Sequence, residues 1–120
     1  MFTPLEKAVL DAMLDKPGEP FETVRKQLAH AVIEKREFSG VGFFTHFVLP
    51  PDAPVRRDLP TEEIGDIGAE FPTLQHGAGF LLFIRDGVVS MLEGFTYDEP
   101  WPTNTDEFKV HTQKAAEPFL

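Results

Sequence analysis

Histidines are the first side chains to consider for acid–base or metal chemistry in this chain. There are four of them, widely spaced: His30, His46, His76 and His111. None stands in HxH, HxxxH or HExxH spacing, so the sequence contains no local metal motif. His46 alternates with Phe44 and Val48, which predicts a strand face on which the imidazole is partly buried. We favour a structural histidine with a satisfied hydrogen bond; the alternative is a catalytic or ligand-binding one.

Glu93 is the second candidate, because its predicted strand is otherwise apolar. In GFLLFIRDGVVSMLEGF, the Asp86-Gly87 dipeptide is typical of a type I′ hairpin turn. Pairing outward from this turn places Glu93 opposite Phe80. Loss of water there would raise the pKa of the carboxyl group towards values useful in acid–base chemistry. We favour a carboxylate at the sheet margin, solvated or hydrogen-bonded. If instead it meets His46, the two form an acid–base or ligand-binding pair.

The third candidate is the segment GFTYDEPWP, residues 94–102, which contains the only tyrosine and the only tryptophan of the chain. Because both residue types are favoured interface anchors, a recognition patch is one interpretation. That patch would comprise Phe95, Tyr97, Asp98, Glu99 and Trp101. The interpretation we favour is a rigid lid whose rings pack on a sheet end, while the prolines stop strand pairing. Tyr97 is also the third polar group, with His46 and Glu93, of a candidate small-molecule pocket.

No other motif indicates a specific reaction. SGVGFF and HGAGF are rich in glycine, but both lead into predicted strands, whereas phosphate loops precede a helix. Ser39 and Ser90 stand in no nucleophile-elbow sequence, and the absence of cysteine removes thiolate nucleophiles and cysteine metal sites. We therefore expect no cofactor and no metal site, and the sequence leaves open whether the protein is an enzyme.

Two helices are predicted at the start of the chain. Thr3, Pro4 and Glu6 have the spacing of an N-cap, a first helical residue and a capping box. A second helix follows the KPGEP turn, with Val24 and Leu28 in its apolar stripe.

Strands follow the helices. We expect two near residues 31–38 and 41–49 with a turn at SG, a third in EIGDIGAEF, two in the Asp86-Gly87 hairpin and a last one in EFKVHTQ. PPDAPVRRDLP is a loop, because no sheet interior accepts its prolines. This order predicts one α+β domain over residues 1–120, with the two helices packed on a mostly antiparallel sheet of five to six strands.

The predicted hairpin is apolar on both faces. An unbroken register places Ile84, Leu82 and Phe80 on one face of the hairpin. It places Phe83, Leu81 and Leu92 on the other face. Two helices can cover only one face, so a curled sheet, long loops or another copy of the chain must cover the second. We expect a homodimer.

The net charge of −9 is concentrated in the second half of the chain. Residues 58–107 contain eleven acids and one base, Arg85. Such a surface repels nucleic-acid phosphates and anionic lipid, so we expect neither partner and favour a protein with a basic surface. The opening residues lack the features of a signal peptide, and the lack of cysteine fits a reducing compartment, so we expect a cytoplasmic protein.

The blocks REFSGVGFFTHF and LEGFTYDEPWP resemble those of a group of small uncharacterised bacterial proteins. The resemblance extends over most of residues 36–102. It implies a bacterial cytosolic origin and transfers no activity, cofactor or site residue.

Two functions are consistent with these features. The leading one is a non-catalytic acidic interaction or regulatory protein that binds a protein partner. The alternative is a small-molecule-binding protein or an enzyme, with a pocket formed by His46, Glu93 and Tyr97.

Overall fold

The protein folds as two helices packed on one antiparallel sheet. The computed structural model describes residues 2–59 and 61–112. The elements are α1 (Pro4–Met13), α2 (Phe21–Leu28), β1 (Val32–Phe38), β2 (Gly42–Val48), β3 (Glu62–Glu70), β4 (Ala78–Arg85), β5 (Val88–Thr96) and β6 (Lys109–Thr112). Neighbouring strands follow the order β1-β2-β5-β4-β3-β6, and every pair is antiparallel. The predicted α+β class and strand number are confirmed.

The first helix begins as the sequence predicts. The Thr3 hydroxyl accepts a hydrogen bond from the Glu6 backbone N–H at 3.1 Å, and the Glu6 carboxylate accepts one from the Thr3 N–H at 2.8 Å. Together they form a capping box that satisfies two otherwise free N–H groups. The apolar face of α1 then packs on the sheet through Leu5, Val9 and Met13.

The central hairpin turns at Asp86-Gly87, as predicted. Both residues have positive φ, 53° and 76°, which a type I′ turn requires. A methyl group on Gly87 would lie 1.8 Å from the carbonyl oxygen of Arg56, so glycine is also needed for the close approach of the loop between β2 and β3.

The predicted register of this hairpin is wrong beyond its first two pairs. Arg85 pairs with Val88 and Ile84 with Val89, but the register then shifts, and Phe83 pairs with Met91. Ser90 is the extra residue of this β-bulge. As a result Phe80 lies opposite Gly94, not Glu93.

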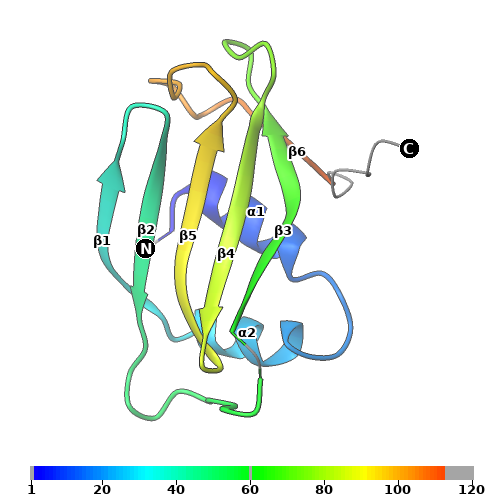
Figure 1. Ribbon diagram of the computed structural model, residues 1–120, viewed down its shortest axis with the longest axis vertical. Helices are drawn as coiled ribbons and strands as arrows, with labels where there is room; N and C mark the ends of the chain where they lie inside the picture. The colour runs from blue at the N-terminus through cyan, green and yellow to red at the C-terminus, as the bar shows by residue number, and fades with distance from the viewer. Residues whose placement is uncertain (1, 60, 113–120) are drawn as a thin grey trace.

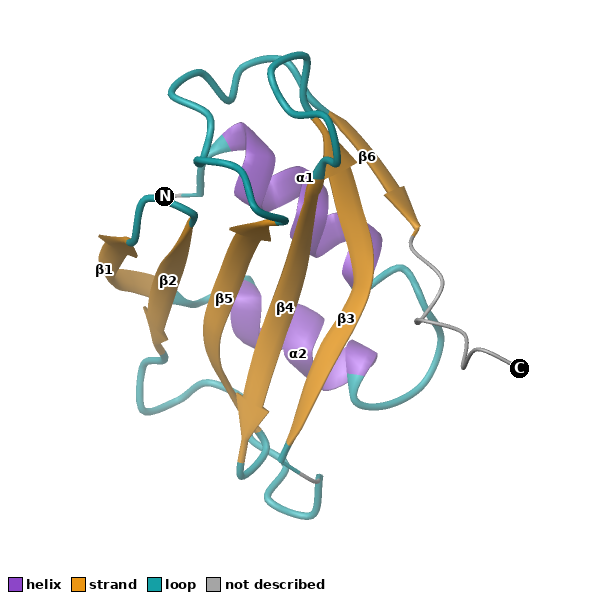
Figure 2. Ribbon diagram, turned by 45° about the horizontal axis from the view of Figure 1, so that its top comes forward, coloured by secondary structure: helices purple, strands orange, loops and turns teal. Residues whose placement is uncertain are grey.

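The helices cover one face of the sheet only (Figures 1 and 2). The core between helices and sheet contains the inward side chains of four strands, among them Phe43, Ile67, Phe80, Leu82, Ile84 and Leu92. The bulge at Ser90 brings Leu92 into this core and turns Met91 and Glu93 to the opposite face. The last predicted strand is present as β6, although Gln113 lies outside the described residues.

Candidate functional site

The sheet face turned away from the helices, called the open face below, holds the candidate residues. In Figure 1 the helices lie behind the sheet, and no described segment crosses in front of β4 and β5. Its centre is formed by partly buried side chains from three strands: Phe44, Leu81, Phe83, Met91, Glu93 and Phe95. As expected, the hairpin is apolar on both faces, but only one of them has a cover among the described residues.

Glu93 lies at the middle of the open face. Its strand neighbours are Phe44 on β2 and Leu81 on β4. Burial among these side chains, together with the negative charge of Glu63, raises the pKa of the Glu93 carboxyl above its ordinary value of 4.5. Among the described residues no hydrogen bond reaches its carboxylate. The apolar surroundings are therefore present, with Leu81 in place of Phe80. The interpretation that we favoured, a carboxylate at the sheet margin, is wrong because β5 is paired on both sides.

His46 shares the open face with Glu93 but is bonded elsewhere. It pairs with Met91, two residues before Glu93, so the two candidates are diagonal neighbours on adjacent strands. The imidazole Nε2 lies 2.6 Å from the carboxylate of Glu37 on β1. Its side chain is 28% exposed, which agrees with the predicted partial burial. His46 thus has a local carboxylate partner, and that partner is Glu37.

Tyr97 lies on the open face at the end of β5. Its ring contacts that of Phe95 edge to face, with centroids 5.6 Å apart. A methyl group at Gly79 would lie 2.6 Å from the Tyr97 hydroxyl oxygen, so this glycine leaves the space that the ring occupies. With 40% of its surface exposed, Tyr97 extends the apolar centre towards solvent.

Two further residues of the GFTYDEPWP segment lie away from the open face. Trp101 packs on the helix side, and Glu99 contacts the loop before β4. The Trp101 ring packs against Phe43 and Phe71, at centroid distances of 5.1 and 5.8 Å. The Glu99 carboxylate accepts hydrogen bonds from the backbone N–H groups of Gln75 and His76 at 2.9 and 3.0 Å, which hold its pKa below the ordinary value.

The two aromatic residues therefore have different surroundings. Trp101 closes the end of the core, as the lid interpretation expects, while Tyr97 stays outside. Asp98 is exposed, with φ 63°, in the turn between them. Of the five proposed interaction residues, the structure places Phe95 and Tyr97 on the open face.

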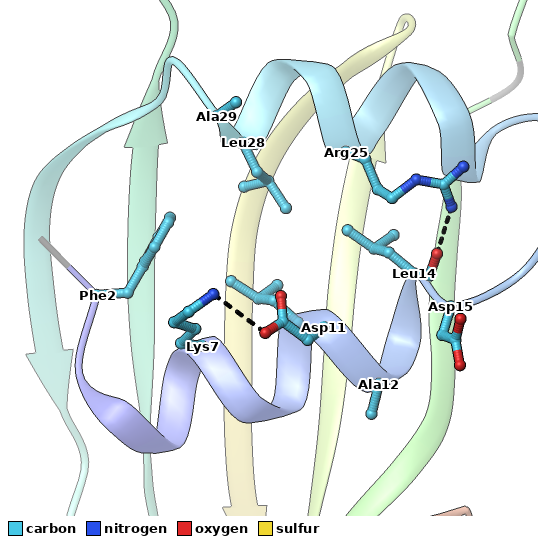
Figure 3. A pocket seen from close by; sticks show the side chains of 10 residues that line it. Phe2, Lys7, Asp11, Ala12, Leu14, Asp15, Arg25, Leu28 and Ala29 are labelled. Carbon is cyan, nitrogen blue, oxygen red and sulfur yellow. Dashed lines mark hydrogen bonds and ion pairs between the residues drawn. The ribbon is translucent and has the colours of Figure 1, made fainter.

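A cavity of about 720 Å³ lies between α1 and α2, on the helix side. Figure 3 shows Phe2, Leu14 and Leu28 directed into it, while Lys7 and Asp11 form an ion pair of 3.1 Å on its rim. Arg25 closes one end by donating to the backbone carbonyl of Leu14. None of the residues lining this cavity is His46, Glu93 or Tyr97.

The described residues hold no metal cluster and no membrane-spanning helix. Within residues 2–59 and 61–112, no three His, Asp or Glu side chains are grouped so that they could hold a metal ion. Neither described helix has the length and apolar character needed to cross a membrane. No family model, curated protein or solved structure matches this chain.

Two acidic neighbours of the candidates were not identified from the sequence. Glu37 and Glu63 lie 9 and 30 residues from His46 and Glu93, and only the strand order brings them close. Their place on the open face follows from pairing with Phe44 and Phe83. For Glu63 the nearest signal in the sequence was the excess of acids in residues 58–107, and for Glu37 it was the predicted pairing of residues 31–38 with 41–49.

The environment of Glu93 predicts that its charge destabilises the fold. Replacing Glu93 by glutamine should raise the free energy of unfolding at pH 7 by roughly 0.5 kcal/mol, since water screens most of the effect at this partly exposed site. The folded pKa is raised, so the cost of the charge is present above that pKa and absent below about 4.5, where both states are protonated.

Urea unfolding at pH 7, 5.5 and 4 measures the difference in free energy of unfolding between the wild type and E93Q. This difference should become smaller as the pH falls. The control is Glu22→Gln on α2, an exposed carboxylate outside the sheet. A loss of stability in E93Q at pH 7 would mean that Glu93 makes a stabilising contact in the folded protein.

Proposed function

We propose that this protein is a non-catalytic binding protein that docks a protein partner with a basic surface on its open face. One observation carries the proposal. Glu93 is an ionisable carboxylate in the centre of an apolar sheet face, without a hydrogen bond among the described residues. Leaving a charge partly dehydrated and unpaired costs stability, so its presence favours a role in binding.

The composition of the open face supports a protein as the partner. Phenylalanine, tyrosine and methionine are enriched in the buried centres of protein interfaces, and this face offers Phe44, Phe83, Met91, Phe95 and Tyr97. The net charge of −9 favours a basic partner, because opposite charges speed encounter. A bacterial cytoplasmic location, which the cysteine-free sequence supports, is part of the proposal.

A homodimer through the open face is the competing arrangement. A small-molecule site at His46, Glu93 and Tyr97 has less support. His46 is already bonded to Glu37. Tyr97 follows the end of β5 with its hydroxyl over Gly79, and no hydrogen bond among the described residues joins it to His46 or Glu93. The 720 Å³ cavity belongs to the helix side.

The test begins with affinity capture from a lysate of the source organism at 50 and 300 mM salt, followed by reconstitution with the purified partner. The wild type and two variants, Leu81→Gln on the open face and Val55→Gln in the loop between β2 and β3, are compared. We expect L81Q to weaken binding at least tenfold and V55Q to have no effect.

The chain's only tyrosine and only tryptophan locate the contact. In protein labelled with 3-fluorotyrosine and 5-fluorotryptophan, the partner should shift the fluorine signal of Tyr97 and leave that of Trp101 nearly unchanged, because Trp101 packs on the helix side. Capture of no partner at either salt concentration, or equal binding by L81Q and the wild type, would contradict the proposal.

A further inference from the structure

We infer that Glu93 is the residue that determines which partner the open face accepts, and that it does so by receiving one arginine side chain. This inference rests on the proposed function and names the chemistry that the partner must present. It concerns a single position of the docking face, so it is testable without knowing the partner.

The neighbours of Glu93 on the open face are apolar side chains that suit the binding of one flat cation. Phe44 and Leu81 lie directly across from it on the two neighbouring strands. Along its own strand, Met91 and Phe95 lie two residues away on the same face, about 7 Å in each direction. Glu93 therefore has four apolar neighbours on the open face, and its side chain stays partly exposed.

No basic side chain of the described residues is paired with the negative charge of Glu93. On β1 and β2, Lys35 and His46 both lie close to Glu37, at 3.8 and 2.6 Å, and Arg36 binds Glu6 on the helix side. Arg85 is four residues along β4 from Leu81, about 13 Å away by the rise of a strand. Glu63 adds a second negative charge near Glu93. Among the described residues, then, no positive charge is paired with Glu93, and we assign that charge to a partner.

Arginine fits this position better than lysine. A guanidinium group is planar, binds a carboxylate through two parallel N–H donors and stacks on aromatic rings such as Phe44 and Phe95. It is also less strongly hydrated than an ammonium group, so it loses less on entering a site surrounded by apolar side chains.

A second copy of the chain fits less well. A two-fold contact through the open face would bury Glu93 of both copies, together with Glu63, in one apolar interface. The bases on this face are already close to Glu37 or lie at its end, so the interface would contain uncompensated carboxylates.

The test uses three small probes that differ only in the head group: Nα-benzoyl-argininamide, the lysine analogue and the uncharged citrulline analogue. The protein is labelled with 13C at its methionine methyl groups. Met91, two residues before Glu93, reports the open face, and Met13, fully buried at the end of α1, is the internal control. We expect the arginine probe to shift the Met91 signal and leave that of Met13 in place.

The arginine probe should bind about tenfold tighter than the citrulline probe, which is the effect of about one charge-assisted hydrogen bond, with the lysine probe between them. In E93Q the three dissociation constants should agree within about twofold, whereas E22Q should retain the wild-type order. E93Q is expected to be at least as stable as the wild type, so misfolding does not complicate the comparison.

Equal binding of the arginine and citrulline probes to the wild type would overturn the inference, as would an arginine preference that survives in E93Q. A dimer at pH 7, seen by sedimentation and unchanged by E93Q, would overturn it in favour of a second copy. These outcomes are distinct from failure of the proposed function, in which no partner is captured or L81Q binds it normally.

Discussion

Replacing Gln27 by leucine is expected to lower the free energy of unfolding by about 4 kcal/mol, because three backbone groups, two of them in buried hydrogen bonds and one in a partly buried one, lose their partners. Gln27 is fully buried. Its amide nitrogen donates to the carbonyls of Pro54 and Gly87 at 3.0 and 2.7 Å, and its amide oxygen accepts from the N–H of Val89 at 2.8 Å. Leucine fills a similar volume but offers none of these bonds.

The loss would be large because Gln27 joins three distant parts of the chain. It connects α2 to the turn of the central hairpin and to the loop between β2 and β3, over 60 and 27 residues of sequence. A domain of this size is stabilised by only about 5–15 kcal/mol in total. The substitution should therefore remove a large part of the free energy of unfolding.

Urea unfolding followed by Trp101 fluorescence and by far-ultraviolet circular dichroism measures this effect. Gln75→Leu is the matched control, since Gln75 is exposed in the loop before β4 and its hydrogen bond to Glu99 comes from its backbone N–H. A change below about 1 kcal/mol in Q27L would show that water or local rearrangement replaces the three bonds.

Gln27 and Glu93 lie on opposite sides of the sheet and differ in their hydrogen bonding. On the helix side the four buried polar side chains all have hydrogen-bond partners: Glu6, Thr23, Gln27 and Thr45. On the open face Glu93 has none among the described residues, and its pKa is raised. One buried side-chain oxygen of the described residues, Asp66 Oδ1 on β3, also lacks a hydrogen bond, but the other oxygen of that carboxylate binds Lys16. Because Glu93 has a partner at neither oxygen among the described residues, it supports a binding role for the open face.

Local features of the fold could be predicted because each is decided within a few residues. The capping box of Thr3 and Glu6 and the turn at Asp86-Gly87 depend on spacing and backbone preference alone. The order of helices and strands followed from such signals.

The bulge at Ser90 could not be predicted in this way. It depends on which hydrophobic side chains the helices cover, and Ser90 itself has no turn or bulge signature. The single extra residue decides that Leu92 enters the core and that Glu93 faces outward, so the candidate site depended on a feature invisible in the sequence.

The partners of the candidate residues also required the sheet order. His46 and Glu93 share a face, as the hypothesis of an acid–base pair needs, but β1 lies on the other side of β2 and brings Glu37 to His46. Tyr97 and Trp101 are four residues apart in sequence, and the turn at Asp98 separates their rings, one over Gly79 and the other against Phe43. Composition alone could not separate these environments.

The second large effect is expected at Glu6, whose capping role is only part of its function. Its carboxylate, 2% exposed, accepts two bonds from Arg36 at 2.7 and 3.0 Å and one from the Thr45 hydroxyl at 2.5 Å. These contacts attach the start of α1 to β1 and β2. Glu6→Ala should lower the free energy of unfolding by about 3–5 kcal/mol at pH 7, since the ion pair with Arg36, the bond from the buried Thr45 hydroxyl and the cap on the Thr3 N–H are lost together.

The same contacts predict a pH dependence with a definite sign. Burial raises the pKa of Glu6, but the hydrogen bonds from Arg36, Thr45 and Thr3 and the charge of Arg36 outweigh it and hold the pKa below the ordinary value of 4.5. The folded state therefore binds the proton less readily than the unfolded state. The stabilisation is complete above about pH 4.5 and is lost as the pH falls through the folded pKa.

Urea unfolding of the wild type, E6Q and the exposed control E22Q at pH 7, 5, 4 and 3 isolates this contribution. The wild type and E22Q should lose stability steeply towards acid, while E6Q, less stable at pH 7, should lose less over the same range and approach the wild type at pH 3. Parallel curves for the wild type and E6Q would mean that Glu6 ionises alike in both states. In that case the bonds to Arg36 and Thr45 would stabilise the fold through geometry, independently of the charge of Glu6.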